Sequence, residues 1–157
     1  MIEKEYYNNK LEEGKKYELF IKEQLYKQKN FKLNLFESKL DQYNIGESLE
    51  GIEIKFDNKM KYTKNVYIEF AEKTNSNNKD WINSGIFRND NTHSWIIGNY
   101  NKAYIFWKIA LQQIFKNKKY LKEVETKTSK GVLLNKEMIK KFKIGKLIFN
   151  KDENRNK

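Results

Sequence analysis

Two stretches of alternating apolar and charged residues, IEIKFD (52–57) and VYIEFA (66–71), constrain the fold of this chain most. Alternation with period two is typical of a half-buried strand, so we expect strands at 50–57 and 65–72. The polar connector is short enough for an antiparallel hairpin. In such a hairpin the charged faces coincide and carry Glu53, Lys55, Asp57 and Glu69, with Lys73 just past the strand end.

Three carboxylates on one face of a sheet repel one another. A divalent cation would resolve the repulsion, because carboxylate oxygens suit Mg²⁺ or Mn²⁺. A lysine beside such a metal can position or deprotonate the water that the metal activates. The alternative is a solvated sheet face on which Lys55 pairs crosswise with Glu53 or Glu69. Alternation alone leaves both interpretations open.

Residues 12–28 predict an amphipathic helix, because Tyr17, Ile21 and Leu25 recur at i, i+4 and i+8. Glu18 lies on or beside this apolar stripe. A carboxylate that faces a core is costly unless it is paired, hydrogen-bonded or bound to metal. The alternative is a boundary glutamate that reaches solvent.

The rest of the chain predicts a single α/β domain over residues 1–150, with a central mixed sheet of about four to five strands flanked by helices. Residues 151–157 are expected to be a disordered tail. The other expected elements are a strand at 31–38, one or two strands around a Gly-Asn turn in 94–107, a helix in 107–121, a solvated helix and loop over 116–130, a helix at 136–143 and an apolar run at 145–149.

Composition limits the chemistry. The 157 residues include no cysteine, which excludes disulfides, thiolate zinc sites and cysteine nucleophiles. With one histidine, a Ser-His or multi-His mechanism is not expected, so carboxylates would have to hold any metal. No 18-residue apolar run and no signal-peptide core appear, so we expect no membrane association and a cytoplasmic location, in a bacterial cell or phage-infected host.

The formal net charge is +11, which favours polyanionic partners, nucleic acid before anionic membrane. The alternative source of this charge is an AT-rich genome, which the abundant lysine and asparagine and the absence of proline indicate.

Several short motifs along the chain occur in a recognisable order. Acid-x-Lys followed by Asp stands at 53–57 (EIKFD), and further along come TKN (63–65), VYIEF (66–70), SGI (84–86), Asp90, SWII (94–97) and SKGVLL (129–134). In this order the chain resembles small phage and bacterial proteins of the PD-(D/E)XK nuclease superfamily, over about residues 14–134.

The resemblance implies a restriction-endonuclease-like fold and Mg²⁺- or Mn²⁺-dependent cleavage of phosphodiester bonds in DNA. It makes Glu53 a metal-binding carboxylate, Lys55 the lysine near the attacking water and Glu18 the acid of the first helix. Asp57 and Glu69 match acids of the wider motif and are counted with the metal site.

The superfamily's second metal acid has no clean equivalent. Glu47 lies six residues before Glu53 and leads straight into the strand, so we favour it over Asp41, twelve residues before. Lys64 stands where glycine is usual, which is expected to change the turn geometry but no chemistry.

Residues beside the SGI loop are expected to contact nucleic acid, with cations on phosphates and the indole on a base. Packing is the alternative for the indole. The residues are Lys73, Lys79, Trp81, Ser84 and Arg88.

Three hypotheses follow. The first is a metal-dependent DNA endonuclease, which by resemblance could act as a homodimer. The second is a catalytically silent nucleic-acid-binding protein of the same fold. The third is a protein-interaction module of a phage or mobile element.

Overall fold

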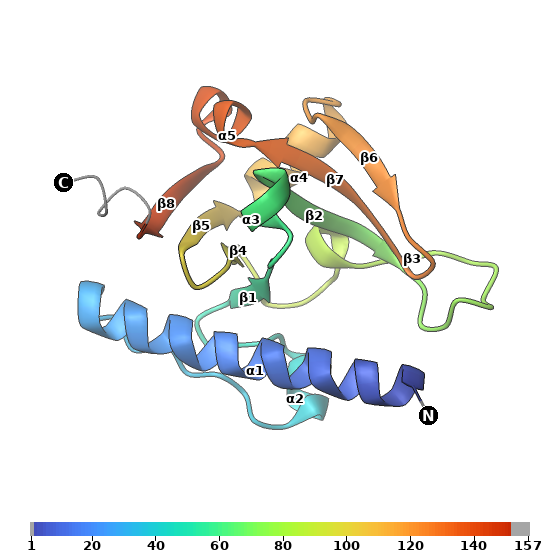
Figure 1. Ribbon diagram of the computed structural model, residues 1–157, viewed down its shortest axis with the longest axis horizontal. Coiled ribbons are helices and arrows are strands. Elements are labelled where there is room, and N and C mark those ends of the chain that lie inside the picture. The colour runs from blue at the N-terminus through green and yellow to red at the C-terminus, as the bar shows by residue number, and fades with distance from the viewer. Residues whose placement is uncertain (1, 152–157) are drawn as a thin grey trace.

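The computed structural model describes residues 2–151, beginning with a long helix, α1 (Ile2–Lys29). The predicted helix at 12–28 is therefore confirmed and is longer than expected. Its apolar stripe of Tyr17, Ile21 and Leu25 is buried against Ile52 and Ile54 of the first strand. Figure 1 shows α1 lying across one side of the molecule, with the strands beyond it.

Sheet 1 has the strand order β1-β4-β5-β8. β1 runs parallel to β4, and the other pairs are antiparallel, so the expected four-stranded mixed sheet is confirmed. All five residues of β4 are buried because both faces of the sheet are covered. The strands are β1 (Ile52–Phe56), β4 (Ser94–Gly98), β5 (Lys102–Trp107) and β8 (Gly145–Asn150).

Sheet 2 was not predicted as a separate layer. Its order is β3-β2-β7-β6, and its strands are β2 (Asn65–Glu72), β3 (Ile82–Asn83), β6 (Lys122–Glu125) and β7 (Ser129–Asn135). The predicted hairpin of 50–57 with 65–72 is wrong, since β1 pairs with β4 and β2 with β7. Val66 and Ile68 lie opposite Leu134 and Val132 of β7, and this pairing buries both apolar rows.

The main core lies between the two sheets. Trp95 and Phe106 of sheet 1 face Ile68 and Leu134 of sheet 2 in one apolar cluster. Helices α4 (Lys108–Lys116) and α5 (Lys136–Phe142) add Leu111, among other residues, to this cluster. The layers are thus α1, sheet 1, core and sheet 2, and the molecule is an α+β domain of the expected class (Figure 1).

Several smaller elements differ from expectation. The strand expected at 31–38 is reduced to one bridge between Leu35 and Ser48, and a short helix α2 (Lys39–Asn44) follows. The solvated helix expected in 116–130 is wrong, because β6 pairs there with β7. A short helix α3 (Met60–Thr63) and a 3-10 turn η1 (Gly85–Phe87) flank β2 and β4.

The β4–β5 hairpin and α5 confirm two of the remaining predictions within a residue or two at each end, whereas α4 ends at Lys116, five residues before the predicted end, and the apolar run at 145–149 forms β8. Of the tail expected to be disordered, 152–157 lie outside the described residues. No helix in the described range is both long and apolar enough to cross a bilayer.

Candidate active site

The edge strand β1 presents Glu53 and Lys55 on the face opposite to Ile52 and Ile54, which pack on α1. Glu53 is only 7% exposed. The Lys55 ammonium Nζ lies 2.8 Å from Glu53 Oε1, and the Lys55 side chain is 49% exposed. The acid therefore lies inside the site and the lysine at its opening.

Glu47 reaches the same site from the loop that enters β1. The backbone N–H of Ile54 donates to Glu47 Oε1 at 2.8 Å, which holds the carboxylate against the strand. Ser48 fixes the loop, because its hydroxyl donates to the Ile52 carbonyl at 2.7 Å and accepts from the Ile52 N–H at 2.9 Å. The preference for Glu47 over Asp41 agrees with this geometry. Asp41 lies on α2, where its N–H bonds to Ser38.

The electrostatics of Glu47 are unusual. Burial, followed by the charges of Glu18 and Glu53, raises its pKa to about 8, although Lys55 and the Ile54 N–H act in the opposite direction. At neutral pH the carboxyl therefore keeps its proton in most molecules. A cation that binds there has to displace this proton, because metal ligands bind in their deprotonated form.

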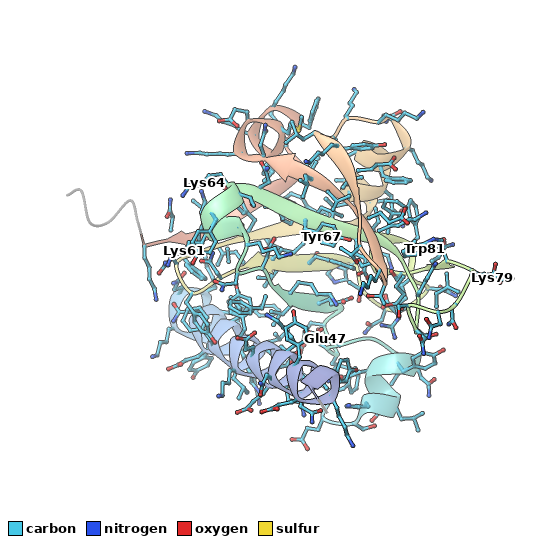
Figure 2. All side chains as sticks on the ribbon, turned by 45° about the vertical axis from the view of Figure 1, so that its right-hand side comes forward. Glu47, Lys61, Lys64, Tyr67, Lys79 and Trp81 are labelled. Carbon is cyan, nitrogen blue, oxygen red and sulfur yellow. The ribbon has the colours of Figure 1, made fainter. Side chains whose placement is uncertain are left out.

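Glu18 lies on α1, within electrostatic reach of Glu47, Glu53 and Lys55. Burial raises the pKa of Glu18, and the nearby charge of Glu53 raises it further, against the opposite effects of Lys55 and Lys15. Figure 2 shows Glu47 close to α1, on the side of the helix that faces the strands. The acid on the helix stripe thus belongs to a cluster of charges and does not point into bulk solvent.

Lys55 connects the acids from both sheets. Loss of water around the ammonium lowers its pKa, whereas the charges of Glu53, Glu47 and Glu69 raise it. The net pKa lies above the ordinary value, so Lys55 stays protonated at neutral pH. In this state it neutralises the acids and cannot accept a proton from water.

Glu69 of β2 supplies the sheet 2 side of the site. Ser84 donates its hydroxyl to Glu69 Oε1 at 2.8 Å, and Ser129 donates to Oε2 at 2.6 Å. The Tyr67 hydroxyl lies 2.6 Å from Ser129 Oγ. Since the Ser129 hydrogen goes to Glu69, Tyr67 donates to Ser129, and a chain of hydroxyls ends on the carboxylate.

The SGI loop reaches Glu69 because of a glycine. Gly85 has φ +52, and a Cβ added there would lie 2.1 Å from the Glu69 carbonyl oxygen. The register of β2 against β7 also shifts between Glu69 and Ala71. This irregularity and the glycine let the loop pack directly on the strand.

Asp57, expected beside the metal, turns away from the other acids. It follows the last residue of β1 and accepts from the N–H groups of Met60 at 3.1 Å and Tyr67 at 3.3 Å. Burial raises the pKa of Asp57, and these N–H groups lower it by a smaller amount. Asp57 thus fixes the start of α3.

The residues expected to contact nucleic acid lie in four different places. Lys73 and Lys130 place their ammonium groups 4.6 Å and 4.5 Å from the centre of the Trp81 ring, and we call these three residues the tryptophan cluster. Ser84 is committed to Glu69, and Lys79 lies on the exposed loop between β2 and β3 (Figure 2).

Arg88 has a structural position. Its Nη2 donates to the carbonyls of Gln42 at 3.3 Å and Tyr43 at 3.0 Å, and its Nε lies 3.6 Å from Asp90 Oδ2. These contacts tie α2 to the loop before β4, so the guanidinium is already engaged.

The carboxylates are chemically suitable ligands for a divalent cation, but their present positions do not form a metal site. Across the described residues, no group of three or more His, Cys, Asp or Glu is close enough to hold a metal ion. Glu53 is paired with Lys55, and Glu47 accepts one N–H. A cation between these two acids would have to replace Lys55 at Glu53 and the proton at Glu47.

Comparison with known proteins adds nothing to these observations, since no family model, curated protein or solved structure matches the chain. Only the residues of this chain therefore indicate a functional site. Three of them were not predicted as site residues, namely Tyr67, Ser129 and Lys130. The sequence signal for Ser129 and Lys130 was the SKG element at 129–131, and that for Tyr67 was VYIEF (66–70), and their contacts depend on the pairing of β7 with β2.

Proposed function

We propose that this protein is a metal-dependent nuclease that hydrolyses phosphodiester bonds in DNA with Mg²⁺ or Mn²⁺. One observation carries the proposal. Glu47, with a pKa near 8, is fixed by the β1 backbone within electrostatic reach of Glu18, Glu53 and Lys55. Acids that hold a proton against their ordinary pKa, beside a lysine in an open edge, are typical of functional sites.

In this proposal Glu47 and Glu53 hold the cation, and Glu18 supports them from α1. When bound, such an ion neutralises charge on the phosphate and lowers the pKa of a water. Release of Lys55 from Glu53 frees its ammonium to stabilise charge that develops on the phosphate. Glu69, held by two hydroxyls, positions the ammonium from the opposite side.

The second candidate, a silent nucleic-acid-binding protein, is favoured by the 2.8 Å ion pair between Lys55 and Glu53. This pair satisfies both charges without a metal. In that case the net charge of +11 would bind nucleic acid without cleavage.

Cleavage of supercoiled plasmid with Mg²⁺ and with Mn²⁺ tests the proposal. We expect Glu53→Gln, Glu47→Gln and Lys55→Ala each to lower the rate by roughly a hundredfold or more, because the first two remove a carboxylate ligand of the cation and the third removes the positive charge next to the phosphate. The exposed Glu37→Gln is the matched control, since it also removes one carboxylate. Thermal unfolding of each variant would show that it remains folded.

Wild-type protein without cleavage under either metal, together with salt-sensitive DNA binding, would favour the silent binder. Cleavage that persists in all three site variants would show that the active site lies elsewhere. Cleavage of RNA in preference to DNA would correct the substrate and leave the site unchanged.

A further inference from the structure

A second polar site lies at the other end of β2. A pocket of about 290 Å³ opens between α3, the β4–β5 turn and α5. Its lining has four lysines and four asparagines but only one acid, Glu137. The lysines are Lys61, Lys64, Lys102 and Lys136, and the asparagines are Asn65, Asn99, Asn101 and Asn135. We call it the lysine pocket.

The charge of the lysine pocket is uncompensated. Across the described residues none of its four lysines forms a salt bridge, whereas seven ion pairs form elsewhere. Glu137, exposed on α5, is free of ion pairs in the same range. Four ammonium groups around one concavity repel one another, so an anion inside would stabilise the arrangement.

The backbone that carries the lysines is fixed. Lys64 has φ +59 and closes α3 by donating its N–H to the Met60 carbonyl at 3.1 Å. The buried Asn99 accepts from the N–H groups of Asn101 at 2.9 Å and Lys102 at 3.1 Å. Asn135 caps α5. The walls are thus held by capping and turn hydrogen bonds, and the ammonium groups of Lys61 and Lys102 lie 5.6 Å and 5.3 Å from the centres of the Tyr62 and Tyr104 rings.

The position of the lysine pocket relative to the acids indicates a chain-like ligand. Along β2, Asn65 lines the pocket, Glu69 lies in the candidate active site, and Lys73 belongs to the tryptophan cluster. Figure 2 shows Lys61 and Lys64 on one side of Tyr67 and Trp81 on the other. Four residues of strand span about 14 Å, a distance that a nucleic-acid strand covers within a few nucleotides.

We propose that the lysine pocket binds a phosphate of the nucleic acid, a few nucleotides from the phosphate at the acids. The pocket holds the polyanion through Lys64 and Lys136, and Asn65 and Asn101 can donate amide hydrogens to phosphate oxygens. The identity of the ligand as nucleic acid rests on the proposed function, whereas the phosphate contact does not depend on cleavage.

Fluorescence anisotropy with a labelled DNA duplex in EDTA tests the contact without any cleavage. We expect Lys64→Ala/Lys136→Ala to weaken binding about tenfold and to lower the salt slope by about two, one for each phosphate-facing cation. The control is Lys29→Ala/Lys116→Ala, which removes the same charge from exposed ends of α1 and α4. The control should change the affinity less than about twofold.

A second arm separates an internal phosphate from a terminal one. Duplexes of equal length with a 5′-phosphate or a 5′-hydroxyl should bind equally if the pocket holds the backbone. A preference for the 5′-phosphate that the pocket variant loses would assign the pocket to strand ends. Either result supports phosphate binding there. Equal binding by wild type and the pocket variant, at every salt concentration, would overturn the inference.

Failure of this inference is distinguishable from failure of the proposed function. If the protein binds DNA through the pocket but never cleaves it, the phosphate site is supported and the proposed nuclease activity is contradicted. If the protein cleaves DNA but binds it equally well without Lys64 and Lys136, the nuclease activity is supported and the phosphate site is contradicted.

Discussion

Two acids near Lys55, Glu47 on the loop before β1 and Glu69 on β2, have very different surroundings. On the sheet 1 side, Glu47 is buried and accepts one hydrogen bond, from the Ile54 N–H. On the sheet 2 side, Glu69 accepts from two hydroxyls, one on each carboxylate oxygen, and a third hydroxyl supports the second of these. One acid thus has a hydrogen-bond partner on one carboxylate oxygen, and the other has a partner on each oxygen.

The difference teaches what each acid can do. A carboxylate that is satisfied by hydroxyls stays in place and gives little to a new ligand. A carboxyl that keeps its proton because its charge is uncompensated will exchange that proton for a cation. Under the proposed function, the sheet 1 side would therefore be the reactive side of the site, and the sheet 2 side would hold it in position.

The pH dependence of stability should show this difference most strongly. The pKa of Glu47 rises from 4.5 when unfolded to about 8 when folded, so the folded state binds the proton more tightly between these values. Stability should then fall as pH rises from about 4.5 to 8, by at most roughly 3–5 kcal/mol. Urea unfolding in EDTA at pH 5.5 and pH 8.5 measures the loss, and Glu47→Gln should remove most of it.

Metal ions sharpen the same experiment. Mg²⁺ or Mn²⁺ should stabilise the wild type more at pH 8.5 than at pH 5.5, because at pH 8.5 fewer molecules carry a proton on Glu47 that the cation has to displace. The exposed Glu37→Gln should keep the wild-type pH dependence. If Glu47→Gln also keeps it, other acids control the stability and the contrast with Glu69 fails.

On the sheet 2 side, the packing of the SGI loop against Glu69 should depend on the backbone conformation of Gly85. Gly85→Ala places a Cβ 2.1 Å from the Glu69 carbonyl oxygen and requires an L side chain at φ +52, so we expect a loss of about 2–4 kcal/mol. Urea unfolding at one pH measures it. Gly14→Ala is the control, because Gly14 lies in α1 with open space around its Cβ and should gain up to about 1 kcal/mol. A loss below about 0.5 kcal/mol at Gly85 would contradict the tight packing.

Removal of one hydroxyl should cost less. Ser129→Ala takes one donor from Glu69 Oε2, but water can reach the half-buried carboxylate, so we expect a loss of about 1–2 kcal/mol. The rate of plasmid cleavage should fall much less than in Glu53→Gln. A cleavage defect as large as that of Glu53→Gln would move Glu69 to the reactive side.

The sequence predicted the face of β1 and the acid on α1 because both follow from periodicity. A strand shows its alternate residues on opposite faces whatever it pairs with, so Glu53 and Lys55 were placed together correctly. Glu18 was recognised because a charge on an apolar stripe requires a partner.

The pairing of strands could not be predicted in the same way. Alternation determines which face of a strand each residue occupies, but not which strand lies beside it. The nearest strand in sequence was therefore taken as the partner of β1, whereas the actual partner is β4, about forty residues further along the chain. Asp57 shows the same limit, since its chain leaves the strand after Phe56 and the carboxylate caps α3. Residues 122–125, rich in helix formers, become β6 because β7 lies beside them.

The smallest expected effect tests whether the hydroxyl chain acts as one unit. Tyr67 donates to Ser129, which donates to Glu69, so each bond should polarise the next. We expect Tyr67→Phe to cost about 0.5–1.5 kcal/mol in wild type, and less in Ser129→Ala, where its acceptor is gone. A double-mutant cycle on the free energy of unfolding should give a coupling of roughly 0.5–1 kcal/mol. Additive losses would mean that Tyr67 contributes packing alone, and that Glu69 is held by Ser84 and Ser129 without a third hydroxyl behind them.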